Sequence, residues 1–289
     1  MPFLELKNSP HAPGVSPVAI HYRDVGGGRP LVFLHGGWGY GVYPINRQVE
    51  AFQEEIAHRQ IRFIIPDRSG HGRSSPFAGP LPPDFHRRAA GETLLLLDSL
   101  GIQRATFWGH SDGAVIAAMI GLMAPARCEH LLLEALHLYR KKPASHSVFF
   151  QKFADHPESV SAKLQKLLAD DHGNDHGDDH GGDRGEDHGA NRWQHVVPRN
   201  CRVWLQLANE STHPQQDLYD GRLSELSVPV TFMHGRHDPR TEPGEIERAH
   251  QSVPASSLRF VETGRHSPHS EEASAAECSA ILRKLVTAP

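Results

Sequence analysis

The sequence has few cysteines and no pattern that would organise them. Its three cysteines, Cys128, Cys201 and Cys278, lie far apart, and none forms a CxxC pair. Zinc knuckles and dense disulfide frameworks depend on closely spaced cysteines, so the sequence indicates neither. We expect three buried thiols.

Long hydrophobic runs are also missing. No stretch approaches the roughly 20 apolar residues that a membrane-spanning helix needs. The first residues, MPFLELKNSPHAPG, do not join a basic segment to an apolar one, as a signal peptide does. The expectation is a cytoplasmic protein without a membrane partner.

Positive charge is not concentrated in any part of the chain. The 289 residues carry a formal net charge of −4. Residues 170–188 alone hold eight acidic residues and one arginine, a net of −7, which leaves +3 for the remainder. Because nucleic-acid-binding proteins carry a basic stripe, that class of partner is set aside.

What the sequence does contain is an alternation of apolar segments with helical patterns such as 87–100 and 114–123. The apolar segments are rich in β-branched residues, and they lie at 31–36, 61–67, 105–111, 131–135, 228–235 and 258–264. Such an alternation predicts buried parallel strands in a doubly wound sheet with helices on both faces. A final helix is expected at about 271–286.

Two further strands are expected near the N-terminus, at 3–7 and 18–22, as an antiparallel hairpin turned by the glycines at 26–28. With the six parallel strands they make a mostly parallel, eight-stranded sheet. The predicted fold class is therefore α/β.

The alternation is interrupted between residues 137 and 226, a segment with helical stretches such as 157–169. We interpret 137–226 as a helical cap inserted between two parts of the core, 1–136 and 227–289. Ligands in open α/β sheets bind beyond the carboxyl ends of the strands, where such a cap would lie.

The sequence Gly109-His110-Ser111-Asp112-Gly113 follows an apolar strand and precedes a helical pattern. A G-x-S-x-G sequence in that context predicts a nucleophile elbow, a sharp turn that exposes the serine hydroxyl. The hydroxyl is a poor nucleophile unless a base accepts its proton and a third group orients the base. We therefore predict Ser111 as the nucleophile.

The base and the orienting acid are predicted near the C-terminus. Asp238 follows the strand at 228–235, and His266 follows the strand at 258–264, so both lie beyond strand carboxyl ends. The chain order Ser, Asp, His is the order found in α/β-hydrolases. His269 and Glu134 are rivals for the roles of base and acid, and we rank both below His266 and Asp238.

The loop His35-Gly36-Gly37-Trp38-Gly39 follows the first parallel strand and faces the elbow. We assign the oxyanion hole to the backbone N–H groups of Gly37 and Asp112, with that of Trp38 as an alternative. Trp38, His110 and Asp112 are the candidate pocket residues. His71, Phe149 and Phe150 are further candidates, although ordinary packing explains them equally well.

The core resembles the α/β-hydrolase superfamily. The resemblance rests on HGGWG at 35–39, DRSGHGRSS at 67–75, GHSDG at 109–113, HGRHD at 234–238 and GRHSPHSE at 264–271. Within the superfamily the chain is similar to serine esterases with an SDG elbow, including valacyclovir-hydrolase-like enzymes. Two positions depart from the pattern: Ala114 stands where a further glycine is usual, and Arg265 stands in place of the glycine before the catalytic histidine.

The resemblance implies a Ser111-Asp238-His266 triad, no cofactor and a small-molecule ester as substrate. C–C bond hydrolysis and amide hydrolysis on the same triad remain alternatives, and a small-molecule receptor is the alternative of a different class. In valacyclovir-hydrolase-like enzymes an acid beside the nucleophile is associated with α-amino substrates, and Asp112 occupies that position. A carboxylate that complements the start of a helix explains Asp112 equally simply, and we favour that interpretation.

The tract at 170–189 repeats His, Asp and Gly, with His172, His176 and His180 at equal spacing. Imidazoles and carboxylates bind zinc, nickel or copper, so these histidines are weak metal-site candidates. Glycine in almost every repeat costs about 1 kcal/mol each in helix propensity, which favours a solvated loop instead. No metal site is assigned.

Overall fold

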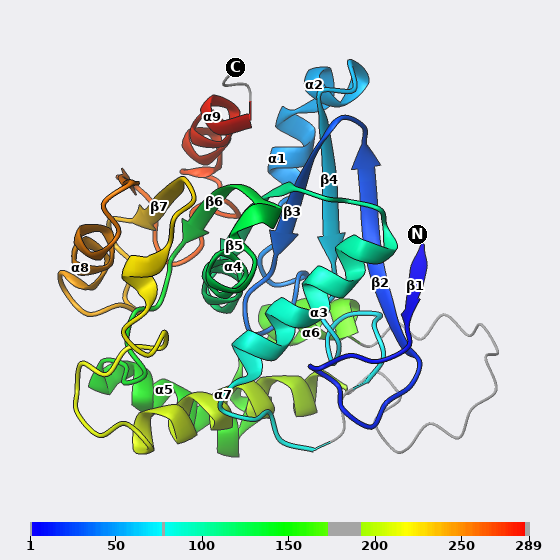
Figure 1. Cartoon of the computed structure of the whole chain (residues 1–289). Helices are drawn as coiled ribbons and strands as arrows, with labels where there is room; N and C mark the ends of the chain where they lie inside the picture. The colour runs from blue at the N-terminus through cyan, green and yellow to red at the C-terminus, as the bar shows by residue number, and fades with distance from the viewer. Residues whose placement is uncertain (1, 77–78, 173–191, 287–289) are drawn as a thin grey trace.

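Eight strands form one sheet in the order β1-β2-β4-β3-β5-β6-β7-β8 (Figure 1). The computed structural model describes residues 2–76, 79–172 and 192–286. The strands are β1 (Phe3–Leu6), β2 (Val18–Gly26), β3 (Arg29–Leu34), β4 (Ile61–Pro66), β5 (Ala105–His110), β6 (Cys128–Glu134), β7 (Val230–Gly235) and β8 (Ser256–Val261). The mostly parallel, eight-stranded α/β sheet predicted from the sequence is confirmed.

The six strands β3 to β8 are parallel to one another. Strand β2 pairs antiparallel with both β1 and β4. All six residues of β5 are buried, as an apolar strand covered on both faces must be. The expected antiparallel pairing of β1 with β2 is present, but the position predicted for its turn is wrong. Because β2 continues to Gly26, the glycines at 26–28 connect β2 to β3.

Helices cover both faces of the sheet. One core contains residues of α3 (Phe85–Ser99), α4 (Asp112–Met123) and α8 (Glu245–Ser252). The core on the other face contains residues of α1 (Asn46–Ala51), α2 (Gln53–Ala57) and α9 (Ala275–Val286). The sequence pattern did not predict α1, α2 or α8, which are short.

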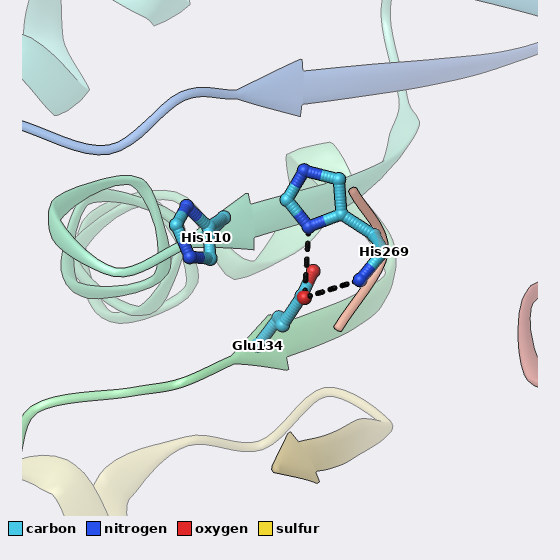
Figure 2. Close-up of side chains that lie close together, drawn as sticks. All are labelled: His110, Glu134 and His269. Atoms are coloured by element: carbon cyan, nitrogen blue, oxygen red, sulfur yellow. Dashed lines mark hydrogen bonds and ion pairs between the residues drawn. The ribbon is translucent and has the colours of Figure 1, made fainter. Parts of the chain in front are cut away.

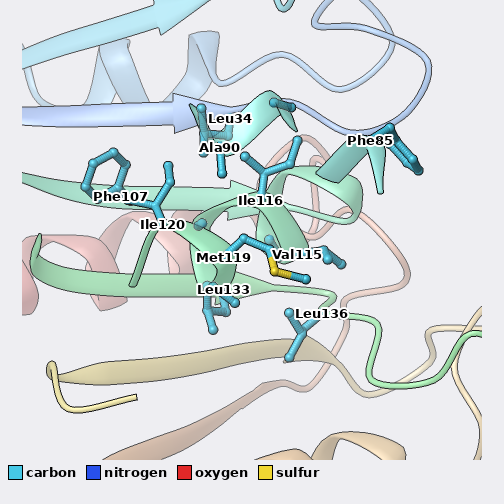
Figure 3. Packing of buried hydrophobic residues seen from close by; sticks show 14 of the residues in the cluster. Leu34, Phe85, Ala90, Phe107, Val115, Ile116, Met119, Ile120, Leu133 and Leu136 are labelled. Carbon is cyan, nitrogen blue, oxygen red and sulfur yellow. The ribbon is translucent and has the colours of Figure 1, made fainter. Parts of the chain in front are cut away.

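Helix α4 is apolar around its whole circumference, and a helix of that kind is buried. Ile116 and Ile120 pack against strand residues such as Phe107 and Leu133, and Phe85 of α3 belongs to the same cluster (Figure 3). Since α4 begins directly after Ser111, this packing holds the turn at residue 111 against the sheet.

Three helices lie between β6 and β7 in the chain: α5 (Ala144–Asp155), α6 (Ala162–His172) and α7 (Trp193–Asn209). Figure 1 shows α5 and α7 beyond the end of the sheet toward which the arrows of β3 and β4 point. The helix expected over 157–169 is two elements, a 3-10 turn at Pro157–Ser159 followed by α6. No helix in the described part of the chain is both long and apolar enough to cross a membrane.

Candidate active site

Ser111 occupies a strained turn between β5 and α4. Its backbone torsions are φ 55° and ψ −119°, a conformation that costs free energy for any residue with a side chain. Side chains are excluded at Gly109 and Gly113, because a Cβ on Gly109 would overlap the Gly113 carbonyl and one on Gly113 the Leu34 carbonyl. The Ser111 N–H also donates to the Glu134 carbonyl of β6 at 2.9 Å, which ties the turn to the sheet.

The structure brings Ser111, His266 and Asp238 together. His266 Nε2 lies 3.1 Å from Ser111 Oγ, and His266 Nδ1 lies 2.9 Å from Asp238 Oδ2. The Asp238 carboxylate is fully enclosed, and it also accepts a hydrogen bond of 2.8 Å from the Arg240 backbone N–H. This geometry allows Nε2 to accept the serine proton while Asp238 fixes the ring through Nδ1.

Burial and charge set the protonation of this group. Burial opposes ionisation of Asp238, but the charge and hydrogen bond of His266 more than offset it, so the pKa of Asp238 lies below its usual value. For His266, burial lowers the pKa more than the Asp238 carboxylate raises it. The imidazole is therefore neutral at pH 7 and able to accept a proton.

A second histidine-carboxylate pair lies behind the first. His269 Nδ1 is 2.8 Å from Glu134 Oε1, and its Nε2 is 3.0 Å from the Tyr43 carbonyl oxygen. Glu134 Oε1 also accepts the His269 backbone N–H, and Oε2 accepts the Trp108 indole N–H at 2.9 Å. Both rivals for the catalytic roles are thus paired with each other, and neither contacts Ser111 through its side chain.

His110 lies beside this second pair, as Figure 2 shows. Its Nε2 lies 3.0 Å from the His266 carbonyl oxygen, and its side chain is completely buried. The prediction of His110 as a pocket residue is wrong, because the strand directs its side chain beneath the histidine loop.

Within the described residues, His110, Glu134 and His269 are the one group close enough to hold a metal ion, but Glu134 and His269 are already hydrogen-bonded.

The two predicted oxyanion-hole amides lie beside Ser111. The Asp112 N–H is the first of α4 and so has no carbonyl partner within that helix. Gly37 lies in the loop after β3 and, like Trp38, lines the pocket above Ser111. His71 supports this loop from behind, with Nε2 3.0 Å from the Gly37 carbonyl oxygen.

The Asp112 carboxylate is held by the helix that covers it. Asn200 Nδ2 of α7 donates to Oδ2 at 2.7 Å, and Trp204 Nε1 donates to Oδ1 at 2.9 Å. His86 Nε2 lies 3.4 Å from Oδ1. Burial alone would raise the pKa of Asp112. His86, the Arg68 charge and the Asn200 hydrogen bond lower it by more than burial raises it, so the pKa falls to about 2. Asp112 is therefore an ionised acceptor, and each of its two oxygens accepts a hydrogen bond from α7.

A pocket opens at Ser111, with about 350 Å³ of space free of protein atoms, open solvent included. Among the predicted pocket residues, Trp38 and Asp112 line it. The remaining lining residues are Gly37, Tyr43, Ser111, His137, His146, Phe149, Phe150, Asn200, Trp204 and Arg240. Most of these residues lie between β6 and β7 in the chain, and the tertiary fold brings them to Ser111.

His137 is a site residue that the sequence did not single out. Its Nε2 lies 3.4 Å from Ser111 Oγ, and its ring stacks on that of His266 with centroids 5.8 Å apart. It follows β6 directly, beyond a strand carboxyl end, and this position is the signal that could have identified it. Burial, with the charges of Lys142 and neighbouring histidines, holds its pKa well below the usual value.

His172, the first of the three metal-site candidates, is buried at the end of α6. The Gly72 N–H donates to its Nδ1 at 2.9 Å, so its Nε2–H donates to the Trp38 carbonyl, also at 2.9 Å. With both ring nitrogens occupied, His172 joins α6 to the loop beside the pocket and has no nitrogen left for a metal. His176 and His180 lie outside the described residues.

Comparisons with known proteins agree with this architecture. A family model described as alpha/beta hydrolase fold matches residues 29–273. The serine hydrolase BPHL of Homo sapiens is 21% identical over 257 residues, which cover 88% of this chain and 79% of that protein.

Two solved structures share the fold. A thermophilic esterase from Thermogutta terrifontis superposes with a TM-score of 0.67 at 18% identity, over 99% of this chain and 100% of that one. An enol-lactonase from Burkholderia xenovorans superposes with a TM-score of 0.62 at 18% identity, over 94% and 97%. With a family model that spans most of its length, the chain belongs to the α/β-hydrolase family.

Proposed function

We propose that the protein is a serine hydrolase that cleaves carboxylic esters of small molecules through an acyl-enzyme on Ser111. The observation that carries the proposal is the chain of contacts from Ser111 Oγ to His266 Nε2 at 3.1 Å and from His266 Nδ1 to Asp238 at 2.9 Å. The esterase and the enol-lactonase with the same fold support ester bonds as the target.

In the first half-reaction, the Ser111 oxygen bonds to the ester carbonyl carbon while its proton passes to His266 Nε2. The carbonyl oxygen becomes an oxyanion, which the N–H groups of Gly37 and Asp112 would stabilise. The bond to the alcohol oxygen then breaks, and His266 returns the proton to the leaving alcohol. In the second half-reaction, water gives its proton to His266 and its oxygen to the acyl carbon, which releases the acid and restores Ser111.

The contacts of Asp112 argue against amino-acid esters as the preferred substrates. Asn200 and Trp204 already donate to this buried carboxylate, so an ammonium group would have to compete with donors that belong to the fold. The structural role favoured from the sequence therefore agrees with the geometry, with α7 added as the partner of the carboxylate.

Hydrolysis of p-nitrophenyl esters from acetate to decanoate tests the proposal. We expect steady turnover by the wild type and a loss of at least about 1000-fold in kcat for Ser111→Ala, because the nucleophile of a triad cannot be replaced by its neighbours. Ser99→Ala is the matched control, since Ser99 is an exposed serine of α3.

Activity that survives in Ser111→Ala would refute Ser111 as the nucleophile. Absence of turnover in both proteins, with saturable ligand binding, would favour the receptor alternative instead.

A further inference from the structure

One cation of the pocket has no anionic partner among the residues that the structure describes. The Arg240 side chain is half-buried at the pocket wall, where Nη2 donates to the Tyr43 hydroxyl at 3.1 Å. No ion pair joins its guanidinium to any carboxylate of the described residues. The guanidinium therefore keeps hydrogen-bond donors that the described part of the chain does not use.

An aromatic wall orients this guanidinium. The Arg240 Cζ lies 5.3 Å from the centre of the Phe149 ring. Phe149 is itself stacked against Trp38, with ring centroids 5.5 Å apart. The N–H groups of a guanidinium lie in its own plane, so a guanidinium held over an aromatic face still presents their edge to a carboxylate, which can accept two parallel hydrogen bonds.

The carboxylates near the pocket do not neutralise Arg240. The Asp238 carboxylate is enclosed and paired with His266, and both oxygens of Asp112 accept hydrogen bonds from α7. The Lys142 ammonium adds a second positive charge nearby, since its Nζ lies 4.3 Å from the centre of the Trp204 ring at the pocket wall. Burial lowers the pKa of His146 in the same wall, and the charges of Arg240 and Lys142 lower it further, so that imidazole is neutral.

We propose that Arg240 anchors a carboxylate of the substrate, so that the preferred esters are half-esters of dicarboxylic acids or other esters with a free carboxylate. The proposal rests on the proposed ester hydrolysis at Ser111 and names the substrate class for that site. A charge-assisted, bidentate hydrogen bond favours the anionic substrate by about 10- to 100-fold over a neutral one of the same shape.

The test compares monoethyl esters of succinate, glutarate and adipate with neutral esters in which an isopropyl group replaces the carboxylate. Ethyl 5-methylhexanoate is the neutral match for monoethyl glutarate, and ethanol release measures both. We expect the wild type to have at least tenfold higher kcat/KM for the anionic member of one pair, and Arg240→Gln to lower that ratio about tenfold.

Arg236→Gln is the matched control, because Arg236 precedes Arg240 by four residues but is exposed and paired with Glu262. It should keep the wild-type ratio. A wild type that prefers the neutral ester of every pair, or an Arg240→Gln protein with an unchanged ratio, would overturn the proposal.

Failure of the proposed ester hydrolysis is distinguishable from failure of this inference. If neither set of esters gives Ser111-dependent turnover, the proposed function has failed, and calorimetric titration with glutarate then tests the anchor alone. Glutarate should bind Ser111→Ala at least tenfold more tightly than it binds Ser111→Ala/Arg240→Gln. Equal affinities would show that Arg240 is not a carboxylate anchor.

Discussion

At the scale of single residues, two histidine-carboxylate pairs lie on one loop, three positions apart. His266 pairs with Asp238 and His269 pairs with Glu134, but of these two histidines only His266 has a ring nitrogen within hydrogen-bonding distance of Ser111 Oγ. The Glu134 pair holds the loop, since Glu134 accepts both the ring and the backbone N–H of His269. In the proposed mechanism one pair performs proton transfer, and the other positions the loop that carries it.

Substitutions of the two carboxylates should separate these roles. We expect Asp238→Asn to lower kcat about 10⁴-fold with little change in melting temperature, because the amide stabilises the wrong imidazole tautomer. Glu134→Gln should lower kcat less than about tenfold, but it should lower the free energy of unfolding by about 1.5–3 kcal/mol through loss of a charge-assisted hydrogen bond. Ester kinetics and thermal melting measure both effects.

The reverse pattern would contradict this division. If Glu134→Gln were the more damaging substitution for kcat in a protein that still folds, Glu134 and not Asp238 would be the acid that supports the base.

At the scale of the elements, helix α7 connects the segment above the pocket to the turn at Ser111. Asn200 and Trp204 are one helical turn apart, and both donate to the carboxylate of Asp112, the first residue of α4. These hydrogen bonds link the start of α4 to the part of α7 that lines the pocket. Because the Asp112 N–H is also a proposed oxyanion donor, α7 stabilises the donor in its position.

Removal of one of these donors should destabilise the protein measurably. Asn200→Ala leaves one oxygen of a buried carboxylate without its partner, which costs about 1–3 kcal/mol in the free energy of unfolding. Urea denaturation followed by tryptophan fluorescence measures the change. Gln206→Ala is the control in the same helix, since Gln206 is exposed and its side chain donates to Glu210, and it should change stability by less than about 0.5 kcal/mol.

An Asn200→Ala protein as stable as the control would mean that the Asp112 carboxylate does not depend on α7. The amine-recognition role of Asp112 would then deserve a direct test with an alanyl ester and its N-acetylated form.

At the scale of the whole molecule, the sequence predicts those features that depend on a short, continuous segment of residues. Apolar runs predict the parallel strands, and the residues that follow them predict where Ser111, Asp238 and His266 lie. The structure places these three within hydrogen-bonding distance. Local patterns suffice there because parallel strands bring their carboxyl ends to one edge of the sheet.

Residues that depend on packing between distant segments could not be predicted in this way. Asn200 and Trp204 contact Asp112 only because α7 crosses the end of the sheet, and Arg240 gains its environment from Phe149 of α5. His110 shows the same limit. Its position beside Ser111 in the motif predicted a pocket residue, but its side chain points away from the pocket, toward the His266 carbonyl oxygen.

The central claim, that Ser111 is the nucleophile, is tested most directly by covalent labelling. A p-nitrophenyl alkylphosphonate transfers its phosphonyl group to an activated serine and releases p-nitrophenolate. We expect intact-mass measurement to show one adduct per chain, peptide mapping to place it on Ser111, and ester hydrolysis to fall in proportion to labelling. Modification of another residue with full loss of activity, or full activity in the Ser111-labelled protein, would contradict the claim.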